Sequence, residues 1–219
     1  MPRALFQKTG MAAYISHLDL MRLFQRGFKR AGLPLTHTQG FNPRPSVSIA
    51  LPLSLGVESV CELLDFDLEG ETCSCEEIKD RLNQCLTEGV RVLQVYDGGA
   101  KIKHLAYLSC DIGLEYDGGI PDGAEQKIED LFASPEVIVE KKGKNGITEQ
   151  NVVTMIRGIS TEAMNDREIL IRATVCCQNP SLNPAQIAAA ISKYLPELNP
   201  DFVRICRREI YDTNHEIFR

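Results

Sequence analysis

Residues 14–59 read YISHLDLMRLFQRGFKRAGLPLTHTQGFNPRPSVSIALPLSLGVES. This stretch holds a helix pattern, a proline-rich loop and a strand pattern in succession. Ser16 and Asp19 have the spacing of a capping box, in which a side chain at the helix start accepts a hydrogen bond from a free main-chain N–H. Apolar side chains then recur every three or four residues, and Gly32 and Pro34 end this pattern. The stretch therefore predicts a helix over residues 16–31 with one buried face.

The other face of this predicted helix is basic. It carries Arg22, Arg26, Lys29 and Arg30. Residues 1–50 hold seven basic residues and one acid, a net charge of +6, whereas the whole chain carries −6, so residues 51–219 carry −12. A basic face on an acidic chain is typical of a surface that binds phosphates, although a solvated helix face would give the same pattern.

The loop HTQGFNPRP, residues 37–45, is predicted to be stiff because its two prolines fix φ. Phe41, Asn42 and Arg44 offer a ring for stacking, an amide and a guanidinium, a combination that binds single-stranded RNA. The alternative is that Phe41 packs back onto the helix and Arg44 only flanks a turn.

Two histidines are candidate catalytic groups. His17 and His37 flank the basic face, and two imidazoles can act as general acid and base in RNA cleavage without a metal. The alternative is that His17 and His37 serve in capping or packing. The chain has no phosphate-binding glycine loop, no HExxH and no GxSxG, so a binding protein is expected rather than an enzyme.

The order of patterns predicts an α+β protein of two tandem ferredoxin-like (βαββαβ) units with antiparallel sheets. The first domain is expected over residues 1–97 and the second over 101–219, with a glycine-containing boundary between them. Strands are predicted over residues 4–15, with a turn or kink at Thr9-Gly10, and over 46–55, 58–68, 91–96, 104–116, 137–141, 151–159, 168–177 and 202–210. Helices are predicted over residues 16–31, 74–89, 122–133 and 183–195.

The eight cysteines indicate no metal site. Neither close pair, Cys73 with Cys75 or Cys176 with Cys177, has the spacing of zinc ligands, and CxxxCxxC is absent. No cofactor is therefore expected, and the role of the two pairs stays open. The start of the chain lacks an apolar leader, and no apolar run is long enough to span a membrane, so we expect a cytoplasmic protein with reduced thiols.

Four segments, residues 14–22, 30–34, 40–45 and 53–59, resemble in order the radical-SAM-linked domain of unknown function found in bacteria. The resemblance covers residues 1–100 best. It implies a radical SAM protein as partner, and the family's gene neighbourhoods point to RNA. Arg44 stands where the family often has His.

The sequence together with this resemblance predicts an accessory protein that binds RNA (tRNA or rRNA) or presents a substrate to a radical SAM partner. The alternatives are a metal-independent ribonuclease that uses His17, or a module that docks on an acidic surface of its partner. In the first hypothesis phosphates are bound by Arg22, Arg26, Lys29, Arg30 and Arg44, and a base is contacted by Phe41 and Asn42.

Overall fold

The computed structural model describes residues 1–70, 73–143 and 146–219. Within these ranges the chain is a mixed α+β protein whose strand pairing is mostly antiparallel, so the predicted α+β class is confirmed. It divides into two compact units. The first comprises Met1–His104 together with Phe218–Arg219, and the second comprises Leu105–Ile217. Among the described residues, no helix has both the length and the apolar character that crossing a membrane requires.

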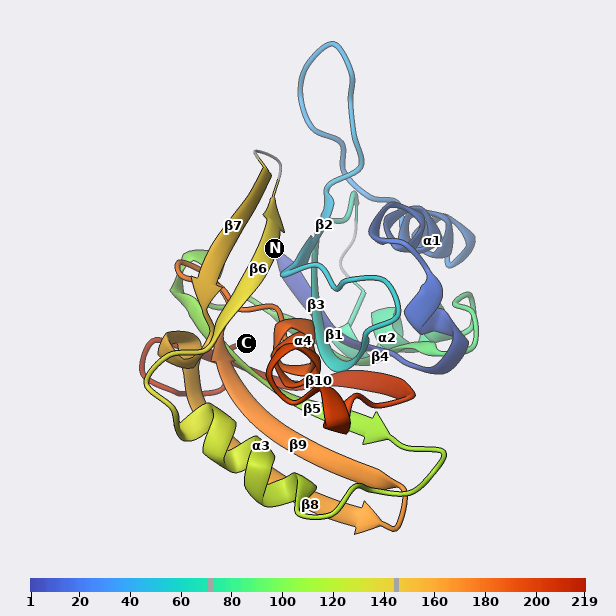
Figure 1. The fold of residues 1–219 in the computed structure, drawn as a ribbon. Helices are drawn as coiled ribbons and strands as arrows, with labels where there is room; N and C mark the ends of the chain where they lie inside the picture. Colours follow the sequence, from blue (N-terminus) through green and yellow to red (C-terminus); the bar gives the residue numbers. More distant parts are fainter. Residues whose placement is uncertain (71–72, 144–145) are drawn as a thin grey trace. The chain divides into compact units, whose positions relative to one another are not determined.

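The first unit contains four paired strands and two α-helices (Figure 1). Its elements are β1 (Pro2–Lys8), α1 (His17–Arg30), β2 (Val47–Ala50), β3 (Glu58–Phe66), α2 (Cys75–Asn83) and β4 (Val90–Asp97). The strand order is β4-β1-β3-β2, because β3 pairs with β1 along one edge and with β2 along the other. Leu64 of β3, for example, lies between Ala4 and Ile49.

Both helices pack on one face of these strands, because buried side chains of α1 and α2 share one hydrophobic core with side chains of β1, β3 and β4. Phe24 and Phe28 of α1 are fully buried, and their rings contact Phe6 of β1 at 4.8 Å and Phe66 of β3 at 4.9 Å between centroids. Burial of one such side chain contributes about 1.5–3 kcal/mol to folding. The apolar face predicted for residues 16–31 is therefore the face that packs on the sheet.

The ends of α1 follow from local sequence. The Ser16 hydroxyl oxygen accepts a hydrogen bond from the Asp19 N–H at 3.2 Å, as the capping-box pattern predicted. At the other end, the N–H of Gly32 donates to the Lys29 carbonyl and that of Leu33 to the Phe28 carbonyl. This is a Schellman turn, and it requires the positive φ of +65° that Gly32 adopts.

Two strands of the first unit are shorter than predicted. β1 ends at Lys8, and Gly10–Tyr14 forms a 3-10 helix, because Gly10 has a φ of +58° that no strand can continue. β2 ends at Ala50, because Leu51 has a φ of +50° and Pro52 has no N–H to donate to the sheet. The observed strand therefore occupies only the first half of the range predicted over residues 46–55.

The second unit has a sheet in the order β10-β5-β9-β8 and a separate hairpin of β6 and β7. Its elements are β5 (Leu105–Glu115), α3 (Ala124–Ala133), β6 (Ile138–Gly143), β7 (Gly146–Asn151), β8 (Ile156–Asn165), β9 (Glu168–Cys176), α4 (Ala185–Tyr194) and β10 (Phe202–Asp212). Ile205, Ile112 and Ile171 align across β10, β5 and β9 and lie in the core.

The prediction of one strand over residues 151–159 is wrong. Residues up to Asn151 pair with β6, Val153–Met155 forms a 3-10 turn, and β8 begins at Ile156. The Asn151 side chain favours this break, because its Oδ1 accepts from the N–H of Val137 at 3.1 Å and from that of Val153 at 3.3 Å.

Candidate functional site

A groove of about 550 Å³ lies beside the C-terminal half of α1 in the first unit. Its apolar walls include Phe28, Leu33, Pro34, Leu35 and Pro45. Its polar residues are Gln25, Arg26, Lys29, His37 and Glu69. The groove thus combines apolar surface with cationic side chains, and it joins the predicted basic helix face to the base of the predicted loop.

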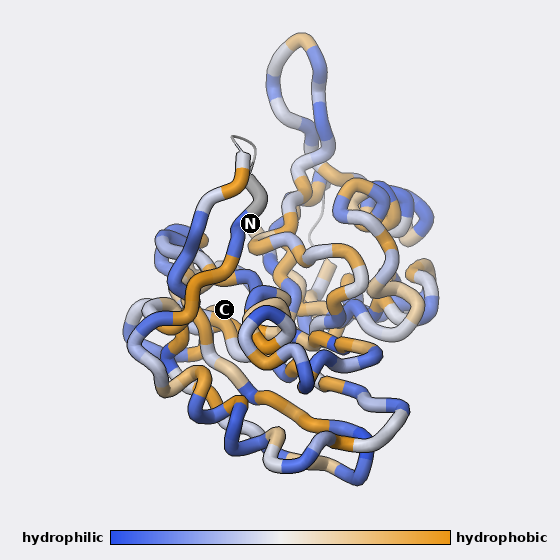
Figure 2. Tube along the Cα trace, viewed as in Figure 1, coloured by the Kyte–Doolittle hydropathy of each residue, from blue (hydrophilic) through white to orange (hydrophobic). Residues whose placement is uncertain are grey.

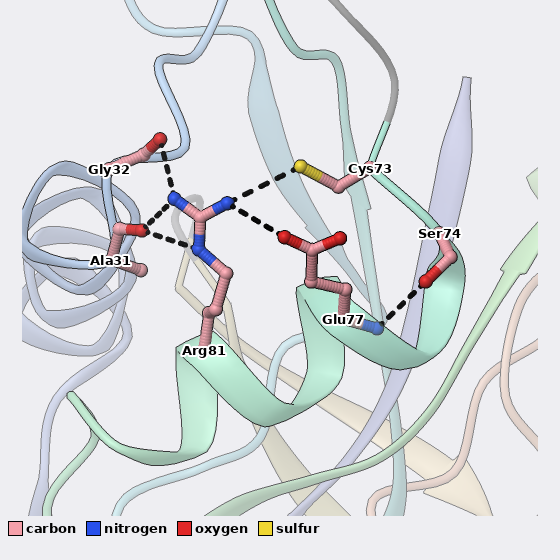
Figure 3. A network of polar contacts seen from close by, with 6 residues as sticks. All are labelled: Ala31, Gly32, Cys73, Ser74, Glu77 and Arg81. Carbon is pink, nitrogen blue, oxygen red and sulfur yellow. Dashed lines mark hydrogen bonds and ion pairs between the residues drawn. The ribbon is translucent and has the colours of Figure 1, made fainter.

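The turn at Gly32 shapes one wall of the groove, and α2 holds that turn in place. Arg81 of α2 donates through Nε to the Ala31 carbonyl and through Nη2 to the Gly32 carbonyl, both at 2.9 Å (Figure 3). These contacts satisfy carbonyls that the end of a helix leaves without main-chain partners. A Cβ at Gly32 would lie 2.9 Å from Arg81 Nη2, so a side chain there would displace the guanidinium.

Arg81 is itself fixed by the first turn of α2. Its Nη1 lies 3.3 Å from the Glu77 carboxylate and 3.3 Å from the Cys73 sulfur, and the Ser74 hydroxyl oxygen accepts from the Glu77 N–H (Figure 3). The Ser74 side chain therefore caps the start of α2. Together these contacts connect the start of α2 to the end of α1.

The loop over residues 37–45 has a paired stem and an open tip. His37 and Pro45 form an antiparallel bridge, the Thr38 N–H donates to the Arg44 carbonyl, and the Arg44 N–H donates to the Thr38 hydroxyl oxygen. In Figure 1 the loop, drawn in light blue, extends away from the helices and sheet of the first unit.

Phe41 does not pack back onto the helix. Its side chain is 105% exposed, so it has no apolar neighbours that shield it from solvent. The tip of the loop is correspondingly coloured as hydrophobic between hydrophilic flanks (Figure 2). Asn42 and Arg44 are exposed beside it. The tip therefore presents a ring, an amide and a guanidinium to solvent.

The basic residues of α1 have different surroundings. Arg26 and Lys29 line the groove. Arg22 forms an ion pair with Asp19 at 2.9 Å, and hydrogen bonds from Ser16 and Arg22 lower the pKa of Asp19. Arg30 donates to the Cys85 carbonyl near the end of α2. Of the four, Arg26 and Lys29 are thus the two that face the space beside the loop.

The two histidines are not brought together. His17 is the first residue of α1, whereas His37 lines the groove beside the C-terminal half of that helix. A helix of 14 residues is about 20 Å long. His37 Nδ1 instead lies 3.9 Å from the Glu69 carboxylate, and both side chains are about half exposed. This geometry does not form a histidine pair of the kind that cleaves RNA.

No group of three or more His, Cys, Asp or Glu side chains with the spacing of a metal site occurs in the part of the chain that the structure describes. All eight cysteines are free thiols. Cys176 and Cys177 are buried in the second unit, and burial raises the pKa of Cys177 to about 12. Cys73 and Cys75 are half-exposed at the start of α2.

Sequence reasoning missed Glu69 and Arg81. Glu69 enters the groove because its N–H donates to the Pro34 carbonyl at 2.8 Å, which brings the segment after β3 beside the segment after α1. Neither residue belongs to a local pattern. Only the pairing of distant segments gives them a role.

A family model described as an uncharacterized protein conserved in bacteria (DUF2344) matches residues 2–184. The chain belongs to this family. The family description names no partner and no activity, so a radical SAM partner stays a prediction. A comparison with curated proteins found none that matches.

Solved structures resemble the chain in fold alone. A chain of the crystal structure of a Cbf5-Nop10-Gar1 complex is 10% identical with a TM-score of 0.51, and the match covers 95% of this chain and 48% of that one. A chain of an H/ACA RNP bound to a substrate RNA containing 2'-deoxyuridine has 10% identity and a TM-score of 0.48 over 94% of this chain and 46% of that one. The present chain thus spans about half the length of these matched chains.

Proposed function

We propose that this DUF2344 protein binds single-stranded RNA through the groove beside α1 and the loop over residues 37–45, and presents that RNA (tRNA or rRNA) to a radical SAM protein. The observation that carries the proposal is the fully exposed ring of Phe41, held at the tip of a paired stem whose base meets the groove. An exposed ring costs free energy in water unless a ligand covers it, and every nucleobase has a face that stacks on such a ring.

The charges around the ring support an anionic ligand. Arg44 lies three residues from Phe41 on the loop, and Arg26 and Lys29 line the groove. Cations placed along a path with an aromatic ring can bind successive phosphates while the ring stacks on a base. A polynucleotide provides both groups at regular spacing.

The strand orders support the further proposal of two ferredoxin-like domains, over residues 1–97 and 101–219. In each unit the first strand lies between the fourth and the third, with the second at the edge beyond, as β4-β1-β3-β2 and β10-β5-β9-β8. Two helices accompany each of these sheets. The hairpin of β6 and β7 would then be an insertion in the second domain.

The proposal of a radical SAM partner rests on the resemblance of four sequence segments to the radical-SAM-linked family. An exposed apolar surface at the start of α1 gives such a partner a place to bind. Met11, Tyr14 and Leu18 are between 57% and 83% exposed, and Leu55 is 65% exposed next to Gly56, whose N–H donates to the Ala13 carbonyl. The same surface favours a protein-interaction module as the second candidate function.

The role of Phe41 can be tested by fluorescence anisotropy with a labelled single-stranded RNA of mixed sequence. Loss of one stacking contact corresponds to about 1–3 kcal/mol, so Phe41→Ala should weaken binding about fivefold or more. Phe202→Ala is the matched control, because Phe202 is also exposed but lies on β10 of the second unit. Equal affinities of the wild type and Phe41→Ala would refute the proposal.

A further inference from the structure

One acid interrupts the cationic groove. Glu69 lines the groove together with Arg26 and Lys29, and its side chain is 58% exposed. A carboxylate beside a phosphate path repels phosphate, so its presence there weakens binding of a plain polyanion. A ligand that combines an anion with N–H donors would suit all three side chains.

The walls of the groove are largely apolar, as is the face of a nucleobase. Phe28, Leu33 and Leu35 are buried side chains whose edges line the groove, and Pro34 and Pro45 add rigid apolar surface. The volume of about 550 Å³ lies in the range of about 300–1,000 Å³ that is usual for small-molecule sites. The groove is therefore large enough to hold one whole nucleotide, and its contacts need not be limited to the phosphate backbone of the RNA.

We propose that the groove binds one guanine nucleotide of the RNA, with Glu69 accepting hydrogen bonds from the base and Arg26 and Lys29 binding its phosphate. The proposal rests on the proposed function. A carboxylate has two parallel acceptor oxygens and forms its strongest contacts with two parallel donors. Guanine places its N1–H and its N2 amino group side by side on the Watson–Crick edge, whereas adenine, cytosine and uracil place one donor group there beside acceptors. Glu69 would thus select guanine.

The test compares oligouridine RNAs that carry one central guanosine, inosine, adenosine or uridine, measured by fluorescence anisotropy with the wild-type protein. Inosine keeps N1–H and lacks the N2 amino group, so it removes one of the two proposed hydrogen bonds without any change in the protein. We expect the guanosine oligomer to bind about tenfold more tightly than the inosine oligomer, because a bidentate pair discriminates by about 1–3 kcal/mol. Equal affinity for guanosine and inosine would overturn the proposal.

Two variants assign the preference to Glu69. Glu69→Gln places an amide where the guanine donors need a second acceptor, so this variant should bind the guanosine and inosine oligomers with equal affinity. Glu88→Gln is the control, since Glu88 is exposed in the same unit outside the groove and the substitution removes the same charge. A guanosine preference that persists in Glu69→Gln contradicts the assignment.

The outcomes separate this proposal from the proposed function. If the protein binds none of the oligomers, the proposed function fails and this inference fails with it. If it binds all four equally, only the guanine site is refuted. Competition with free GMP and UMP distinguishes the source of the nucleotide: GMP that binds while the guanosine oligomer does not would assign the groove to a free nucleotide and overturn the RNA site.

Discussion

Arg81 donates a hydrogen bond from Nη2 to the carbonyl oxygen of Gly32 at 2.9 Å, and so ties α2 to the end of α1. The same guanidinium donates to the Ala31 carbonyl and contacts the Glu77 carboxylate. A planar guanidinium can make these contacts at once, and a lysine ammonium cannot reproduce their geometry. The groove wall at Gly32 thus depends on a residue 49 positions away in the sequence.

We expect Arg81→Ala to lower the free energy of unfolding by about 2 kcal/mol, because hydrogen bonds from a charged donor each contribute about 1.5–3 kcal/mol and water replaces part of them. Urea denaturation measures this change. Arg91→Ala is the matched control: Arg91 is exposed on β4, and its removal should change stability by less than about 0.5 kcal/mol. Equal effects of the two substitutions would contradict a connecting role for Arg81.

Local patterns in the sequence were enough to predict α1, its cap at Ser16, its end at Gly32 and its buried face. Such features depend on residues a few positions apart. The α+β class followed from the order of elements. A kink was predicted at Thr9-Gly10, but the 3-10 helix that follows it was missed. The early end of β2 was also missed, because a positive φ at Leu51 is not visible in an apolar run.

The candidate site was predictable only in part. The loop and basic helix face were found because each is a continuous segment with unusual composition. Glu69 was missed because its place depends on a main-chain hydrogen bond to Pro34. The sequence also could not show that Arg26 lines the groove whereas Arg30 does not. Only the packing of α2 shows that Arg30 donates to the Cys85 carbonyl.

Lys8 gives stability a specific dependence on pH. Its side chain is 2% exposed and donates to the Ala13 carbonyl at 2.9 Å, and burial lowers the pKa of Lys8 from 10.5, with Glu62 opposing the shift. Between the lowered pKa and 10.5 the unfolded chain holds more protons than the folded protein. The contribution of Lys8 to the free energy of unfolding therefore rises with pH across that interval.

Lys8→Met should remove this rise, which urea denaturation at a series of pH values below 10.5 would detect. Lys103→Met, at an exposed lysine of the same unit, should retain the wild-type profile. Parallel profiles for the wild type and Lys8→Met would contradict the prediction.

Two buried thiols should resist modification. Burial raises the pKa of Cys110 and of Cys177 to about 12, and the thiolate is the form that reacts. We expect iodoacetamide near pH 8 to label the half-exposed Cys73 and Cys75 long before these two in the folded protein. Mass spectrometry of peptides gives the rates, and labelling in urea, where all eight thiols should react, is the control.

The dependence of RNA affinity on salt should locate the phosphate path. Each phosphate contact with a single strand contributes about 0.7 to the slope of log affinity against log salt concentration. Arg26→Ala and Lys29→Ala should therefore each reduce the slope by about 0.7, because both side chains line the groove. Arg22→Ala should change it less, since the ion pair with Asp19 already neutralises that charge. Anisotropy titrations over a range of salt concentrations measure all three, and equal reductions would place the phosphates along the whole helix face rather than in the groove.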